Sequence, residues 1–233
     1  MGFNVNRIRN EILQLPQQDQ YTQTLETLIE ANEAAKNIYN YAVWLKRNGH
    51  MDKLTHVLDA IVPEMKKEQF VQVIANQVQA PKTWSDKSIV YYAGQSFEDW
   101  SDKSLDRGLG GSETAIVRLA QEWIKLGYEV TVYCNCGDEE GVRDGVTYKH
   151  FATINWNDTF NIFIIWRNPG VLDIDIKAAK ILYDAHDIES NLNWTPERIK
   201  KLHKAFFKSA WHRSNVPNLP DEKTAIIHNG IEV

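Results

Sequence analysis

The sequence predicts an α/β protein in which a helical N-terminal region precedes a parallel-sheet domain. Residues 1–80 show helical periodicity only. From Lys87 onward, short continuous apolar runs alternate with helical patterns, which is typical of strands that helices cover on both faces. A glycine-rich stretch, Gly108–Glu113, lies between the first apolar run at 89–94 and the first helical pattern at 112–126.

The N-terminal region is predicted to contain four helices joined by short loops, so that neighbouring helices run antiparallel. Their expected ranges are 7–15, 21–48, 54–61 and 65–78. Ala80-Pro81-Lys82-Thr83 marks the expected boundary, with a helical subdomain over 1–82 and a sheet domain over 83–233. Two roles stay open for the helices. They pack as a cap on the following domain, or they dock a partner or a second subunit.

The sheet domain is predicted to contain seven strands with helices between them. The expected strands are 88–94, 129–135, 146–151, 161–166, 180–185, 205–209 and 224–228. Asp144-Gly145 predicts a turn before the third strand, and helices are expected over 196–204 and near Ala210. Ligands of such sheets bind at the carboxyl ends of the strands.

The glycine stretch favours an anion site, with a simple tight turn as the alternative. Ser112 is the expected N-cap of the helix and Gly127 its stop. A helix N-terminus attracts anions, and glycine lets a phosphate approach the backbone closely. The stretch lacks the G-x-G-x-x-G spacing, and the next strand ends in Cys134-Asn135-Cys136 without a clear ribose-binding carboxylate. A nicotinamide or flavin enzyme is therefore disfavoured.

Three motifs resemble the retaining glycosyltransferases of the GT-B fold, in particular family 4. They are Gly108–Glu113, His186 within Tyr183–Asp187, and the closing Ile226–Ile231. The resemblance covers roughly residues 87 to 233. It implies a Rossmann-like domain, the N-terminal, acceptor-side half of GT-B. It also implies transfer of a sugar, with retention, from a nucleotide-sugar co-substrate to a glycan or other small acceptor. No other cofactor is implied.

The resemblance also implies roles for individual residues. Gly110, Gly111, Ser112 and Glu113 would lie near the donor phosphates or a phosphate-bearing acceptor, and His186 would be catalytic and touch the reacting sugar. Arg167 and Asp187 fall at the same predicted edge as possible acceptor contacts. The alternatives are a histidine that is only hydrogen-bonded at a strand end, a glutamate that only complements the helix dipole, and a surface arginine.

The chain departs from the family because it stops where the donor-binding C-terminal domain should begin. The family's paired-glutamate donor motif belongs to that half, so we expect the chain alone to be inactive. Two explanations for the absence of that domain stay open. The sequence is a fragment of a full enzyme, or it is a natural half that pairs with another chain. The alternative function is a non-catalytic binding or scaffold protein that reuses the fold.

Composition excludes several other classes. Residues 1–80 carry 8 Lys and Arg against 9 Asp and Glu, and the rest carries 18 against 22, so no basic excess indicates nucleic-acid binding. No apolar run is long enough to span a bilayer. The 2 cysteines are one residue apart, which excludes a disulfide framework and, without a second ligand pair, disfavours a zinc site. A cytoplasmic location is the expectation.

Overall fold

The computed structural model describes residues 18–61, 69–78, 80–137 and 139–230. The expected helix at 7–15 and the start of the one at 65–78 lie outside these residues. The chain divides into two compact units, Met1–Ala80 and Pro81–Val233, which are described separately.

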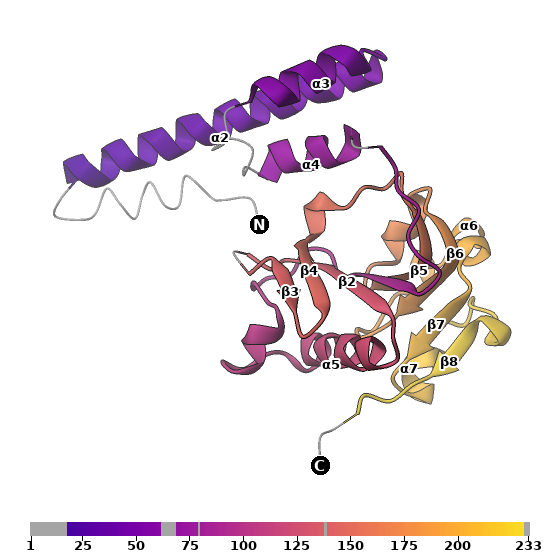
Figure 1. Ribbon diagram of the computed structural model, residues 1–233. Helices are drawn as coiled ribbons and strands as arrows, with labels where there is room; N and C mark the ends of the chain where they lie inside the picture. Colours follow the sequence, from indigo (N-terminus) through magenta and orange to yellow (C-terminus); the bar gives the residue numbers. More distant parts are fainter. Residues whose placement is uncertain (1–17, 62–68, 79, 138, 231–233) are drawn as a thin grey trace. The chain divides into compact units, whose positions relative to one another are not determined.

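The described part of the first unit consists of three helices, α2 (Gln18–Arg47), α3 (Met51–Ala60) and α4 (Gln69–Val78). After the turn at Gly49, α3 folds back alongside α2 (Figure 1). Leu54, early in α3, packs with Ala42 and Leu45, late in α2, so the two helices are antiparallel. Ile61, which caps the end of α3, lies in a second cluster with the earlier Ala35.

The described residues of the second unit form an eight-stranded sheet in the order β3-β4-β2-β1-β5-β6-β7-β8. Every neighbouring pair is parallel except β3 and β4. The α/β class and the mostly parallel sheet are confirmed, and they are consistent with a Rossmann-like fold. The strands are β1 (Ser88–Tyr92), β2 (Glu129–Cys134), β3 (Gly141–Arg143), β4 (Val146–His150), β5 (Thr159–Trp166), β6 (Lys177–Asp184), β7 (Lys204–Phe207) and β8 (Thr224–Ile226).

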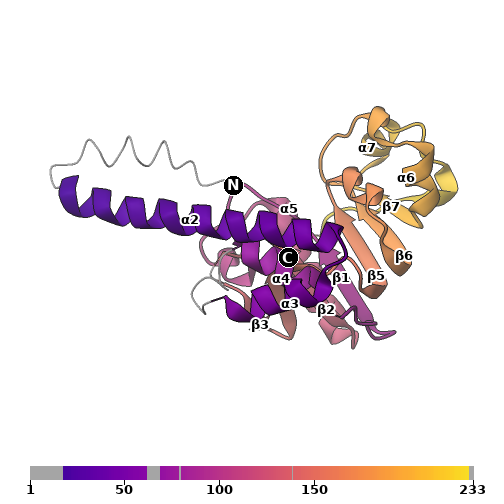
Figure 2. The ribbon, with the colours of Figure 1, turned by 90° about the horizontal axis from the view of Figure 1, so that it is seen from above.

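Alternate side chains of the strands build two cores, one on each face of the sheet. On β1, Ile89 and Tyr91 belong to the core under helix α5 (Gly111–Lys125), whereas Val90 belongs to the opposite core. Figure 2 shows α6 (Pro196–Lys201) and α7 (Ala210–Ser214) beside β6 and β7. Short 3₁₀ turns complete the connections at η2 (Asp102–Leu105), η3 (Phe151–Thr153), η4 (Pro169–Asp173), η5 (Asn191–Asn193) and η6 (Asp221–Lys223).

Helix α5 ends where the sequence predicts, at Gly127, but its N-cap differs from the predicted one. Gly127 has φ +82° and stops the helix, because its N–H donates to Ile124 O and that of Tyr128 donates to Trp123 O. The N-cap is Gly110 and not Ser112, which is the second residue of the helix. The helix therefore starts two residues earlier than predicted, with an N-cap that offers no side-chain oxygen.

The predicted turn at Asp144-Gly145 is present and closes the hairpin of β3 and β4. Both residues have positive φ, +47° and +81°, as a two-residue hairpin turn requires. Strand β3 itself was not predicted. In the described part of the chain, no helix is both long and apolar enough to cross a membrane.

Candidate functional site

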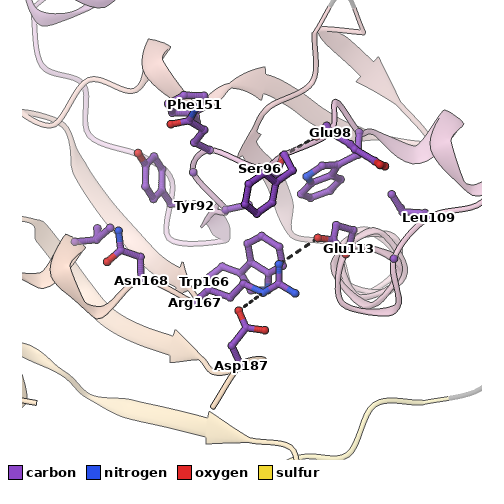
Figure 3. A pocket seen from close by; sticks show the side chains of 17 residues that line it. Tyr92, Ser96, Glu98, Leu109, Glu113, Phe151, Trp166, Arg167, Asn168 and Asp187 are labelled. Carbon is purple, nitrogen blue, oxygen red and sulfur yellow. Dashed lines mark hydrogen bonds and ion pairs between the residues drawn. The ribbon is translucent and has the colours of Figure 1, made fainter. Parts of the chain in front are cut away.

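A pocket of about 610 Å³ opens at the carboxyl edge of the sheet (Figure 3). Its volume falls in the range of small-molecule sites. The walls come from the segments that follow β1 and β5, from the start of α5, from Phe151 after β4 and from Asp187 after β6. The pocket lies where the strand order reverses, since β1 pairs with β2 on one side and β5 on the other. This is the position at which open α/β sheets bind ligands.

Arg167 is the residue on which the pocket elements converge. Its Nη1 lies 3.2 Å from Oε1 of Glu113, and its Nε lies 3.0 Å from Oδ2 of Asp187. The guanidinium stacks over the ring of Trp166 at 3.9 Å. Figure 3 shows Arg167 between the two carboxylates. Its backbone adopts φ +57°, an uncommon and strained conformation for a residue with a Cβ, and such strain is concentrated at functional sites.

Glu113 covers the start of α5. A Cβ added at Gly110 would collide with Oε2 of Glu113, whereas one added at Gly111 would meet open space. The carboxylate thus lies beside the helix N-terminus, where the dipole favours a negative charge. Gly110 and Glu113 line the pocket, whereas Gly111 and Ser112 do not.

The long segment between β1 and α5 is anchored in its middle and exposed near its start. Trp100 is buried, and its backbone N–H donates to Asn135 O over 2.8 Å. The buried Ser101 caps η2 and donates its hydroxyl to Glu139. Phe97, which lines the pocket, is 91% exposed. An exposed aromatic ring beside a pocket offers a contact surface for a ligand.

His186 is buried beside Trp166 and does not line the pocket. Its side chain is 1% exposed, its Nε2 lies 3.2 Å from Oδ2 of Asp184, and its ring meets Trp166 edge-on at 6.0 Å. It is not among the described residues that line the pocket. The predicted catalytic role of His186 stays a prediction, and its buried ring would have to move to reach a sugar in the pocket.

Asp184 is the centre of a buried polar cluster behind the pocket. It accepts hydrogen bonds from the Tyr91 hydroxyl at 2.7 Å and from Lys208 Nζ at 2.6 Å, and it pairs with His186. Burial would raise the pKa of Asp184, but His186 and Lys208 outweigh this effect and lower it. Burial, together with Asp184, raises the pKa of Tyr91 well above its usual range. The cluster is therefore an ionised carboxylate held by three donors, which fixes the end of β6.

The structure brings together Gly110, Glu113, Arg167 and Asp187 of the residues predicted from the sequence. Sequence reasoning missed the aromatic walls: Tyr92, Phe97, Trp100, Phe151 and Trp166. The available signal was that Tyr92 and Trp166 are the last residues of β1 and β5, so they reach the ligand-binding edge.

Neither cysteine forms a metal centre with other ligands. Cys134 and Cys136 are free and buried. Across residues 18–61, 69–78, 80–137 and 139–230, no group of three or more His, Cys, Asp or Glu side chains could hold a metal ion.

In comparisons with protein-family models, curated proteins and solved structures, nothing matched this chain.

Proposed function

We propose that this chain is the acceptor-side half of a GT-B-fold retaining glycosyltransferase, which takes its sugar from a nucleotide-sugar donor. The observation that carries the proposal is the pocket at the carboxyl edge, where Gly110, Glu113, Arg167 and Asp187 meet. Glycosyl transfer needs an acceptor hydroxyl held in a fixed place. Rigid strand ends, a stacked arginine and aromatic walls are suited to that task.

In this proposal the residues of the pocket bind the acceptor. Donor binding would come from a second domain or a partner chain, and the N-terminal helices, a separate all-α subdomain, would cap or dock. His186 would act on the sugar only after leaving Asp184. While it is buried, it supports Trp166 and so the wall of the pocket.

A panel of oligosaccharides tests this function through binding, because binding does not require the donor half. Saturation-transfer NMR on the full chain should detect a retained glycan. Phe97→Ala should abolish the signal, since Phe97 lines the pocket and its exposed ring supports no core. Leu192→Ala is the matched control: Leu192 is 87% exposed and does not line the pocket, so its loss should leave binding unchanged.

A non-catalytic binding or scaffold protein is the second candidate. The observation in its favour is that Glu113 and Arg167 pair across the start of α5, so side chains already fill the glycine edge. If no glycan binds the wild-type chain, or if both substitutions leave binding unchanged, the glycosyltransferase proposal fails and this candidate gains support.

A further inference from the structure

The charges that line the pocket are mostly negative. The charged lining residues are Glu98, Glu113 and Asp187 against the single guanidinium of Arg167. Three carboxylates and one guanidinium leave an excess of two negative charges. Like charges brought together in a partly enclosed site repel strongly, so this balance disfavours an anionic ligand.

The one cation in that lining is already engaged. Arg167 forms ion pairs of 3.2 Å with Glu113 and 3.0 Å with Asp187, and its plane lies against Trp166. A guanidinium binds phosphate through paired N–H donors. The Nη2 of Arg167 takes part in neither ion pair, but a phosphate bound there would lie beside the carboxylates of Glu113 and Asp187 and be repelled by them.

The start of α5 is also occupied from within the chain. The carboxylate of Glu113 lies against Gly110, as the collision of its Oε2 with an added Cβ shows. The positive end of the helix dipole therefore faces a carboxylate of the same helix. A phosphate that approached the glycines would meet this negative charge first.

The uncharged part of the wall contains several aromatic side chains, beside polar ones such as Ser96 and Asn168. Tyr92, Phe97, Trp100, Phe151 and Trp166 line the pocket, and Phe97 is largely exposed. Aromatic faces pack against the C–H faces of sugar rings, and carboxylates accept hydrogen bonds from hydroxyl groups. Together these groups suit a ligand that has hydroxyls and no negative charge.

We propose, on the basis of the function proposed above, that the pocket binds an uncharged sugar as acceptor and rejects its phosphorylated form. Glu113 is the residue that sets this specificity, because it neutralises Arg167 and covers the start of α5 at the same time. The glycines Gly110 and Gly111 thus do not receive an acceptor phosphate in this chain.

The test compares matched pairs of ligands on the full chain. Glucose, galactose, mannose and N-acetylglucosamine are each titrated beside their phosphate monoesters, and binding is located by the NMR shifts of Arg167, Gly110 and the Trp166 indole. For every sugar that binds, the free form should bind about tenfold or more tightly than the phosphate. Glu113→Gln should reduce or reverse that ratio. Equal or tighter binding of the phosphate by the wild-type chain would overturn the proposal.

Inorganic pyrophosphate gives a second measurement that needs no sugar. At millimolar concentration it should leave the pocket signals of the wild-type chain unchanged and should shift those of Glu113→Gln, in which Arg167 loses its ion pair with Glu113 and keeps the one with Asp187. Saturable binding in the wild-type pocket would contradict the inference while leaving the proposed function intact. If no free sugar and no phosphate monoester perturbs the pocket, the inference fails, and the oligosaccharide panel described above decides the proposed function separately.

Discussion

At the scale of single residues, Glu189 shows how burial changes a carboxyl group. It lies in the segment after β6, is 8% exposed, and accepts a hydrogen bond from the hydroxyl of Tyr183. Its second oxygen is also buried. Burial raises the pKa of Glu189 from 4.5 to about 8. The folded chain therefore binds a proton at neutral pH that the unfolded chain releases.

This proton makes stability depend on pH with a defined sign. Between pH 4.5 and about 8 the folded state holds one more proton than the unfolded state, so the free energy of unfolding falls as pH rises. Glu189→Gln removes the ionisation and keeps an acceptor for Tyr183. We expect the wild type to lose up to about 1.4 kcal/mol per pH unit relative to this variant. Urea unfolding at several pH values measures the difference.

Glu197→Gln is the control for that experiment. Glu197 lies at the start of α6, and hydrogen bonds from its own backbone and from Thr195 lower its pKa. Its substitution should not stabilise the chain at pH 8. A Glu189→Gln variant no more stable than wild type at that pH would show that Glu189 is not held protonated.

At the scale of elements, we expect replacement by alanine to affect stability in opposite directions at Gly145 and Gly111. Gly145 has φ +81° in the hairpin turn, and an added Cβ would approach Ile124 Cγ2 to 2.9 Å. Gly145→Ala should therefore destabilise the chain by about 1–3 kcal/mol. Gly111 is the first residue of α5 with open space around it, so Gly111→Ala should leave stability unchanged or raise it by about 0.5–1 kcal/mol. Thermal unfolding of both variants compares them, and equal losses would contradict the assigned turn.

The sequence predicts the elements that have strong local patterns and misses those that depend on a neighbour. The buried run of β1 and the periodicity of α5 place both elements within two residues of their observed bounds. Strand β3 has only three residues and exposes Val142, so no apolar pattern reveals it. Strands β5 and β6 begin before their predicted starts because their first residues, Thr159 and Lys177, are exposed and polar.

The part of the site that the sequence predicts follows from one rule, that ligands of parallel sheets bind at the carboxyl ends of the strands. That rule gathers Gly110, Gly111, Arg167 and His186 at one edge, and of these Gly110 and Arg167 line the pocket. It does not say which way a side chain turns, and His186 is directed into the interior by Asp184 and Trp166. From the sequence alone, Tyr92 and Trp166 could equally be core residues or pocket residues. In the structure they are both, because a residue at a strand end can pack against the core and line the pocket.

At the scale of the whole molecule, the first residues of the sheet unit donate hydrogen bonds to the buried carboxylate of Asp158. Asp158 is 4% exposed and accepts hydrogen bonds from Lys82 N at 3.0 Å and Trp84 Nε1 at 2.9 Å. Thr159, beside it, exchanges backbone hydrogen bonds with the same segment, its N–H donating to Lys82 O and its carbonyl accepting from Trp84 N. Residues 82–84 are thus a structural part of the sheet unit and not only a linker.

Two shortened chains should therefore differ sharply although they differ by only four residues. A chain that starts at Pro81 keeps both donors to Asp158 and both cores, and we expect it to fold cooperatively. A chain that starts at Ser85 leaves Asp158 without those donors, and it should be less stable by about 3 kcal/mol, since a charged group deprived of its partners is costly to bury.

Trp84→Phe in the full chain removes the indole donor alone and should reduce the free energy of unfolding by about 1–3 kcal/mol. Urea unfolding followed by circular dichroism measures all three. Equal stability of the two shortened chains would mean that water replaces both donors at no cost and that the sheet unit begins later, at β1.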